Sequence, residues 1–122
     1  MKIYKLGNHY LANGDCCDGM FVEEMMKRIG EPKIRCILSD PPYAVAYVES
    51  KANFKIGEEG ISNKTIIQND QLQTEDEYAE FTKKWIEPIK EHLDSYNSAY
   101  IFNSDLMICA LRGGVQSGRI LL

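Results

Sequence analysis

The sequence predicts an α/β fold in which a parallel sheet is flanked by helices. Short apolar runs that resemble strands alternate along the 122 residues with segments whose apolar side chains recur at helical spacing. One of these strand-like runs leads directly into a rigid turn that contains two prolines. Strands that alternate with helices are typical of parallel sheets, in which each helix carries the chain from one strand to the next.

The chain begins with two strand-like segments. Lys2–Leu6 and His9–Ala12 are expected to form short strands or a hairpin across Gly7-Asn8. Asn13-Gly14-Asp15 is expected to end the second strand as a turn.

A helix is expected from about Asp18 to Ile29, where apolar residues recur on one face: Phe21, Val22, Met25, Met26 and Ile29. Either Asp15 or Asp18 can cap its start, and Gly30 and Pro32 are expected to end it.

The next apolar run, Ile34–Leu38, is expected to be the central strand. Residues 44–73 carry little periodicity and many polar side chains, so they are expected to form a long irregular loop. A loop of this length inside a compact domain is usually functional or disordered. The length of the chain suits a single domain that spans residues 1–122.

The second half begins with Thr74-Glu75-Asp76-Glu77, which has the pattern of a capping box at the start of a helix. Apolar residues continue on one face of that helix as far as Leu93, and Trp85 among them is expected to lie in the core. Asn97–Phe102 is expected to be a strand, with Asn103 and Asp105 at its carboxyl end. Leu106–Leu111 is expected to be a short helix stopped by Gly113-Gly114.

The composition excludes several classes of protein. The four cysteines form no Cys-x-x-Cys pair and lie far from both histidines in sequence, so no metal site is expected. No apolar run is long enough to cross a membrane, and the first residues do not form a secretory signal, so we expect a cytoplasmic protein with reduced cysteines. The net charge of −4 is unusual for a chain that binds DNA by itself.

The most informative segment is Ser39-Asp40-Pro41-Pro42-Tyr43, which directly follows the central strand. Two successive prolines restrict φ and remove two N–H donors, so carbonyls are the free polar groups of this turn. Open α/β sheets bind ligands at the carboxyl ends of their strands. There, the Asp40 carboxylate and the Pro41 carbonyl can accept both hydrogens of a nucleobase amine, and Tyr43 can stack on a base that has left its duplex.

Asp40-Pro41-Pro42-Tyr43 resembles the Asp-Pro-Pro-Tyr motif of the S-adenosylmethionine-dependent amino-DNA methyltransferases, which methylate adenine N6 or cytosine N4. Asn13-Gly14-Asp15-Cys16 lies upstream, as at the start of the circularly permuted group in which this motif precedes the glycine-rich cofactor motif. The resemblance spans about residues 11–114.

The resemblance implies roles for particular residues. Asp40 and the Pro41 carbonyl would accept hydrogen bonds from the target amine, Pro42 would shape the turn, and Tyr43 would stack on the flipped base. The implied cofactor is S-adenosylmethionine, and its expected binding residues are Asp15, Cys16 and Asp40. A role of Asp15 as a helix cap is an equal alternative. The implied partner is double-stranded DNA, and Asp at the first motif position favours adenine N6 as the target.

The resemblance also implies that the fold is a partial Rossmann-like methyltransferase fold. The Phe-x-Gly-x-Gly cofactor motif of the family is absent from the sequence, so the chain is expected to be the amino-terminal portion of an enzyme. In the family, other strands separate those expected at His9–Ala12 and Ile34–Leu38. The sheet would then contain a gap, and a second chain that completes it is an expected partner.

Two other interpretations remain open. The chain is alternatively a non-catalytic remnant, or a subunit that binds DNA or a partner in a split methyltransferase. It is also compatible with an unrelated α/β domain that carries the motif by chance, and failure of Ile34–Leu38 to form a strand would favour that interpretation.

Overall fold

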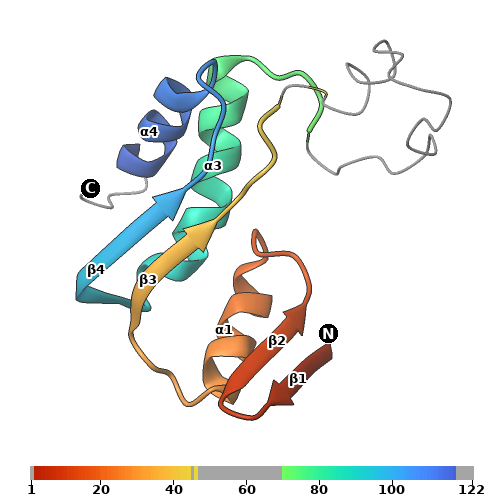
Figure 1. The fold of residues 1–122 in the computed structure, drawn as a ribbon, viewed down its shortest axis with the longest axis vertical. Helices are drawn as coiled ribbons and strands as arrows, with labels where there is room; N and C mark the ends of the chain where they lie inside the picture. Colours follow the sequence, from red (N-terminus) through yellow and green to blue (C-terminus); the bar gives the residue numbers. More distant parts are fainter. Residues whose placement is uncertain (1, 45, 47–69, 118–122) are drawn as a thin grey trace, which may run out of the picture.

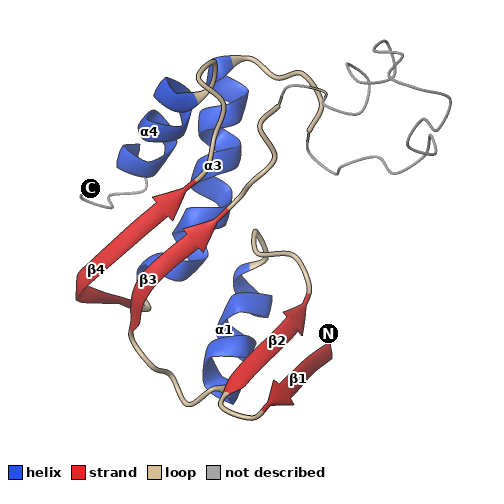
Figure 2. Ribbon diagram, in the orientation of Figure 1, coloured by secondary structure: helices blue, strands red, loops and turns tan. Residues whose placement is uncertain are grey.

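The computed structural model describes residues 2–44, 46 and 70–117, and it shows a mixed α/β fold with small sheets (Figures 1 and 2). The elements in chain order are β1 (Lys2–Leu6), β2 (His9–Asn13), α1 (Gly19–Arg28), β3 (Ile34–Ser39), α3 (Glu75–Lys90), β4 (Leu93–Ile101) and α4 (Ile108–Ser117). Most of the loop expected at 44–73 lies outside the described residues. Among those described, no helix is both long enough and apolar enough to span a bilayer.

The first two strands form the hairpin that was one of the two arrangements predicted. β1 and β2 pair antiparallel, with Leu6 opposite His9, so the connection is the predicted Gly7-Asn8 pair. Gly7 has φ = 63°, a conformation that glycine adopts without steric cost and that tight hairpin turns need.

Helix α1 begins and ends close to the predicted residues. The side chain of Asp18, and not that of Asp15, caps the helix by accepting hydrogen bonds from the N–H groups of Met20 and Phe21. Gly30 follows the C-cap with φ = 89°, which reverses the chain toward β3.

The central strand forms as predicted and pairs with β4. β3 and β4 are parallel, with Leu38 opposite Tyr100 and Ser39 opposite Ile101. β4 begins at Leu93, earlier than the predicted Asn97, because the pairing starts as soon as α3 ends. The Ile34 N–H donates to the carbonyl of His92 at 2.8 Å, and this bond draws the chain into the sheet where helical periodicity alone favoured more helix.

The predicted capping box starts α3. The Thr74 hydroxyl accepts from the Glu77 N–H, and the Glu77 carboxylate accepts from the Thr74 N–H at 2.8 Å. The main core lies where α3 packs against α4, and Trp85 is buried there as predicted. The buried residues of this core are Ala44, Tyr78, Trp85, Ile86, Ala110, Leu111 and Val115.

The predicted end of the last helix is wrong. Leu106–Leu111 was expected to stop at Gly113-Gly114, but α4 continues through both glycines to Ser117. Gly114 is buried against α3, where a Cβ would lie 2.6 Å from the Thr82 Cβ. The glycine therefore permits close approach of two helices, and this packing offsets its low helix propensity.

The described strands form two separate two-stranded sheets, so only one parallel pair is observed. Figure 1 shows α3 and α4 on the same side of the β3–β4 pair, with α1 beside the β1–β2 hairpin. Helix α1 contacts the end of α3, where the His92 Nε2 lies 3.4 Å from the Glu23 carboxylate. Strands β2, β3 and β4 all point toward the same end of the molecule, and the turn after β2 lies below those after β3 and β4 (Figure 1).

Candidate functional site

The Asp40–Tyr43 turn leaves the carboxyl end of β3. The Phe102 N–H donates to the Ser39 carbonyl at 2.9 Å, so the pairing with β4 holds the last residue of β3, directly before the turn. Pro41 is buried, Pro42 and Tyr43 are half-buried, and Asp40 is exposed. Ala44 then has φ = 55°, and the chain changes direction directly after Tyr43. The turn therefore presents its carboxylate to solvent from an anchored backbone.

Within the turn, Asp40 and Tyr43 contact one another. The Tyr43 hydroxyl donates a short hydrogen bond to the Asp40 Oδ1. This bond stabilises the protonated phenol, and burial adds to the effect, so the pKa of Tyr43 is raised. In this conformation the ring of Tyr43 is tied to the carboxylate that was predicted to accept from a target amine.

Asp70, which sequence reasoning did not single out, holds the second half of the turn. Its Oδ1 accepts from the Tyr43 N–H at 3.2 Å, and its carbonyl accepts from the Ala46 N–H at 2.7 Å. Asp70 is 5% exposed, and a buried carboxylate needs such hydrogen bonds. No local pattern in the sequence marks this residue, because Tyr43 and Ala46 lie more than twenty positions away from it.

A second set of contacts reaches the turn from α3 and from the end of β4. The hydroxyl of Tyr78 donates to the Pro42 carbonyl at 2.9 Å, and the Asn103 Nδ2 donates to the Tyr78 hydroxyl at 2.9 Å. The Asn103 Oδ1 in turn accepts from the Ser104 N–H at 2.7 Å. Burial raises the pKa of Tyr78, and the hydrogen bond from Asn103 opposes that shift. From the sequence, Asn103 was marked only by its position after a predicted strand, and Tyr78 was one of the residues in the predicted helix after Thr74 with no role assigned to it.

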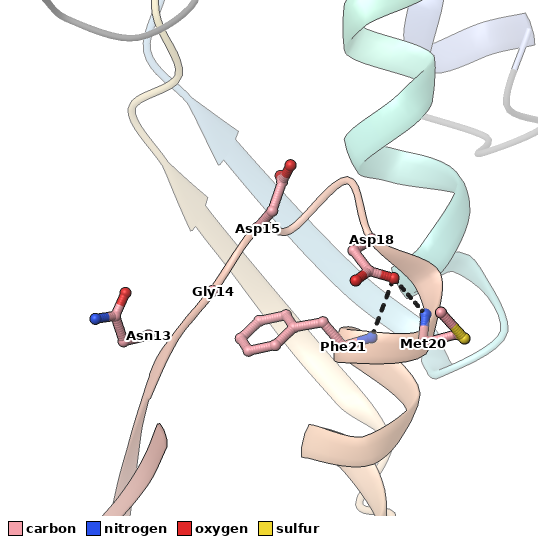
Figure 3. A pocket seen from close by; sticks show the side chains of 6 residues that line it. All are labelled: Asn13, Gly14, Asp15, Asp18, Met20 and Phe21. Carbon is pink, nitrogen blue, oxygen red and sulfur yellow. Dashed lines mark hydrogen bonds between the residues drawn. The ribbon is translucent and has the colours of Figure 1, made fainter. Parts of the chain in front are cut away.

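The Asp15–Asp18 turn lies between β2 and α1, and each aspartate holds a different backbone group. The Asp15 Oδ1 accepts from the Cys17 N–H at 2.9 Å, while Asp18 caps α1. Figure 3 shows the Phe21 ring pointing toward Gly14 and the side chain of Asp15 pointing away from that ring. A Cβ at Gly14 would overlap the Phe21 ring, so only glycine fits there in this arrangement.

These residues surround an open depression with a volume of about 370 Å³. It is lined by Asn13, Gly14, Asp15, Asp18, Met20 and Phe21 (Figure 3). Asp15 and Asp18 supply carboxylates, and Phe21 supplies an aromatic surface. The depression can therefore take a ligand that carries a positive charge beside an apolar portion.

Asp15, Cys16 and Cys17 are the one group of three potential metal ligands among the described residues. Their ligand atoms lie within 4.8 Å of one another. However, burial and the neighbouring Cys16 and Asp15 raise the pKa of the Cys17 thiol to about 12. Because thiolates are the metal-binding form of cysteine, a metal at this position would have to displace the proton of Cys17.

The structure thus brings the Asp40–Tyr43 turn together with Asp70, Tyr78 and Asn103. The Asp15–Cys16 segment is on the turn before α1, and Asp15 hydrogen-bonds to its own turn and not to Asp40. The core connects the Asp15–Cys16 segment with the Asp40–Tyr43 turn, because the Cys17 side chain packs against the hydrophobic cluster that contains Ala44.

No protein-family profile, curated protein or solved structure matches this chain.

Proposed function

We propose that this chain is the amino-terminal portion of an amino-DNA methyltransferase with a partial Rossmann-like fold. The enzyme would methylate the exocyclic amine of a flipped base, and N6 of adenine is the favoured target. The observation that carries this proposal is the acceptor-rich Asp40–Tyr43 turn at the carboxyl end of β3, in a parallel pair flanked by helices. Ligands bind at this end of the strands in open α/β sheets.

The turn has the acceptors that an amine requires. The Asp40 carboxylate is exposed, and within the described part of the chain no hydrogen bond reaches the Pro41 carbonyl. Two acceptors that bind both amine hydrogens draw the nitrogen toward sp³ geometry, which localises its lone pair. Asp40 thereby polarises the amine, and alignment with electrostatic stabilisation supplies most of the rate increase.

We expect Tyr43 to leave Asp40 when the base occupies this position. Its hydroxyl holds the carboxylate oxygen that the amine needs, and its ring is the surface on which the base would stack. Entry of the base therefore exchanges a tyrosine–carboxylate hydrogen bond for an amine–carboxylate hydrogen bond. Pro42 keeps its place in this exchange, because its carbonyl is held by Tyr78.

The depression beside Asp15 fits part of the methyl donor. S-adenosylmethionine, when bound, supplies a methyl group on a positively charged sulfonium, and its methionyl portion also carries an ammonium group. Asp15 would accept from that ammonium, and the Phe21 ring would lie against the apolar portion. Cys16, the other predicted cofactor residue, is adjacent to Asp15 in the chain but does not line the depression. Asp40 would contribute negative charge near the sulfonium.

The rest of the donor site would come from outside this chain. The sequence has no Phe-x-Gly-x-Gly motif, and its net charge of −4 does not provide a basic face for DNA. We therefore expect a second chain, or a further segment of the same protein, to complete the sheet and to contact double-stranded DNA. The proposal places the protein in the cytoplasm, where its free cysteines stay reduced.

A non-catalytic subunit is the second candidate function. The observation that favours it is the separation of the strands into two small sheets, which leaves β3 and β4 with one strand neighbour each among the described residues. Unpaired strand edges invite pairing with another chain. In that case the Asp40–Tyr43 turn would serve the binding of a partner or DNA without methyl transfer.

Calorimetric titration of the purified chain with S-adenosylmethionine tests the first proposal. We expect saturable binding that is weakened in Asp40→Ala and in Asp15→Ala. Asp105→Ala is the matched control, because it removes the same charge from an exposed position after β4 without altering either turn. Equal affinity of all variants for S-adenosylmethionine would show that neither Asp40 nor Asp15 contributes to cofactor binding.

Methyl transfer from labelled S-adenosylmethionine to double-stranded DNA then separates the two candidates. A completed enzyme should label adenine N6, and Asp40→Asn should lose most of this activity because an amide is a weaker acceptor than a carboxylate. Binding of DNA or of a partner without any labelling would favour the non-catalytic subunit.

A further inference from the structure

The Asp40–Tyr43 turn is anchored by a relay of two hydrogen bonds that involves the buried Tyr78 and the half-buried Asn103. Asn103 donates through Nδ2 to the Tyr78 hydroxyl, and that hydroxyl donates to the Pro42 carbonyl, with 2.9 Å at each step. The three residues come from the end of β4, from α3 and from the turn after β3. The relay therefore ties the turn to the helix and to the neighbouring strand at once.

The turn depends on such a tie because of its own sequence. Pro41 and Pro42 have no N–H groups, so neither can anchor the backbone as a donor. A carbonyl is the only backbone group by which Pro42 can be fixed, and a carbonyl needs a donor from elsewhere in the fold. Tyr78 supplies that donor.

Each member of the relay is itself fixed in orientation. Tyr78 is fully buried, and its ring packs against Phe81 with 5.9 Å between ring centroids. The Asn103 amide cannot turn round without cost, because the Ser104 N–H donates to its Oδ1 and so directs Nδ2 toward Tyr78. Since consecutive hydrogen bonds polarise one another, the donor at Pro42 gains strength from Asn103.

We infer that Tyr78 and Asn103 are positioning residues that bind the Pro42 carbonyl and thereby leave the Pro41 carbonyl, beside Asp40, to receive the target amine. This inference rests on the proposed function, since it names the residues that orient the acceptors of the same site. Neither Tyr78 nor Asn103 touches the base or the donor.

Tyr78 remains the donor to the Pro42 carbonyl over a wide range of pH. Burial raises the pKa of Tyr78, so the phenol stays protonated and continues to donate at neutral pH. The nearby Asp70 acts in the same direction through its negative charge, and it also binds the Tyr43 N–H. Pro42 and Tyr43 are thus anchored independently, one by its carbonyl and the other by its N–H.

The test compares two nucleosides that differ only at the amine. Adenosine offers two amine hydrogens, whereas N6,N6-dimethyladenosine offers none. We expect the wild-type chain to prefer adenosine, as measured by NMR titration of the backbone amides around Tyr43, and we expect Tyr78→Phe to reduce this preference about tenfold. Asn103→Ala should reduce it less, because Tyr78 can still donate without Asn103.

Ile86→Val is the matched control for stability. It thins the same buried core on α3 but carries no group that can take part in the hydrogen bonds of the relay, so it should keep the preference for adenosine. A purely structural role of Tyr78 would make Tyr78→Phe and Ile86→Val alike when compared at equal stability. Retention of the wild-type preference in Tyr78→Phe would overturn the inference and leave the proposed function intact.

Amide hydrogen exchange separates the inference from the proposed function. If the relay holds the turn, exchange at the Tyr43 and Ala46 N–H groups should accelerate in Tyr78→Phe and not in Ile86→Val. A wild-type chain that binds both nucleosides equally would overturn the proposed function. Unchanged exchange in Tyr78→Phe would instead overturn the relay.

Discussion

The hydroxyl of Tyr43 donates to the carboxylate of Asp40, three residues earlier in the same turn. The contact joins the aromatic ring on which the proposed base would stack and the carboxylate that would accept from its amine. In the described conformation the Tyr43 hydroxyl is bound to one oxygen of the Asp40 carboxylate. Under the proposed function, this contact would break when a base enters.

Removing the Tyr43 hydroxyl should release the carboxylate. Tyr43→Phe keeps the aromatic surface, so we expect adenosine to bind more tightly than to the wild-type chain, as measured by NMR titration. Tyr43→Ala, which also removes the ring, should bind adenosine more weakly. Weaker binding by Tyr43→Phe would show that the hydroxyl itself contacts the ligand.

The same contact predicts a change in tyrosine titration. The hydrogen bond to Asp40 is the main reason that the pKa of Tyr43 is raised. In Asp40→Ala the phenol loses that acceptor, so its pKa should fall toward the ordinary tyrosine value. Spectrophotometric titration of the phenolate absorbance, with Tyr43→Phe to identify the group, measures the shift. An identical titration curve in wild type and Asp40→Ala would contradict the contact.

The two adjacent glycines of α4 should respond in opposite ways to alanine. Gly113 has open space around the position of a Cβ, so Gly113→Ala should stabilise the fold by about 0.5–1 kcal/mol. At Gly114 the added Cβ would meet the Ala79 carbonyl at 2.5 Å, so Gly114→Ala should destabilise it by about 1–3 kcal/mol. Urea unfolding of both variants measures the difference. Stabilisation by both would mean that α4 does not pack closely on α3.

The capping box of α3 should stabilise the fold in a pH-dependent manner. Thr74→Ala should cost about 1 kcal/mol at neutral pH, because the Glu77 N–H loses its acceptor. Hydrogen bonds from Thr74 lower the pKa of Glu77. Stability from that ionised carboxylate is present above its unfolded pKa and is lost as pH falls through the folded pKa. The difference between wild type and Thr74→Ala in urea unfolding should therefore shrink in acid.

Tyr78 should make the fold sensitive to alkaline pH. Because its pKa is raised in the folded state, the stability it contributes is present below the unfolded pKa and is lost as pH rises through the folded pKa. Denaturant unfolding should show a loss of stability above the ordinary tyrosine pKa, and Tyr78→Phe should flatten that loss. Tyr96→Phe, which removes an exposed phenol from β4, is the control. An unchanged slope in Tyr78→Phe would show that Tyr78 is not the responsible group.

Local patterns predicted the elements whose stabilising contacts are themselves local. The hairpin across Gly7-Asn8, the Asp18-capped helix and the Thr74–Glu77 box all depend on residues at most a few positions apart. Such contacts are readable from spacing, because turn geometry and caps require particular residue types at neighbouring positions. The Asp40–Tyr43 turn belongs to the same class, since its rigidity follows from its two prolines.

The errors occurred where a distant segment decides the local structure. Gly113-Gly114 has the pattern of a helix end, yet Gly114 lies inside α4, where it allows close contact with Thr82. The start of β4 moved to Leu93 because Ile34, far away in sequence, binds the carbonyl of His92. In both cases an interhelical contact or a strand pairing outweighed the local preference.

The sequence by itself determined that an acceptor-rich, proline-stiffened turn follows an apolar strand, because both properties depend on residues 34–43 alone. Only the tertiary structure decided which groups anchor that turn. Asp70, Tyr78 and Asn103 reach it from separate segments, and no spacing in a linear sequence encodes their convergence. The physical reason is that prolines remove backbone donors locally, so that a donor from elsewhere in the fold must bind the Pro42 carbonyl.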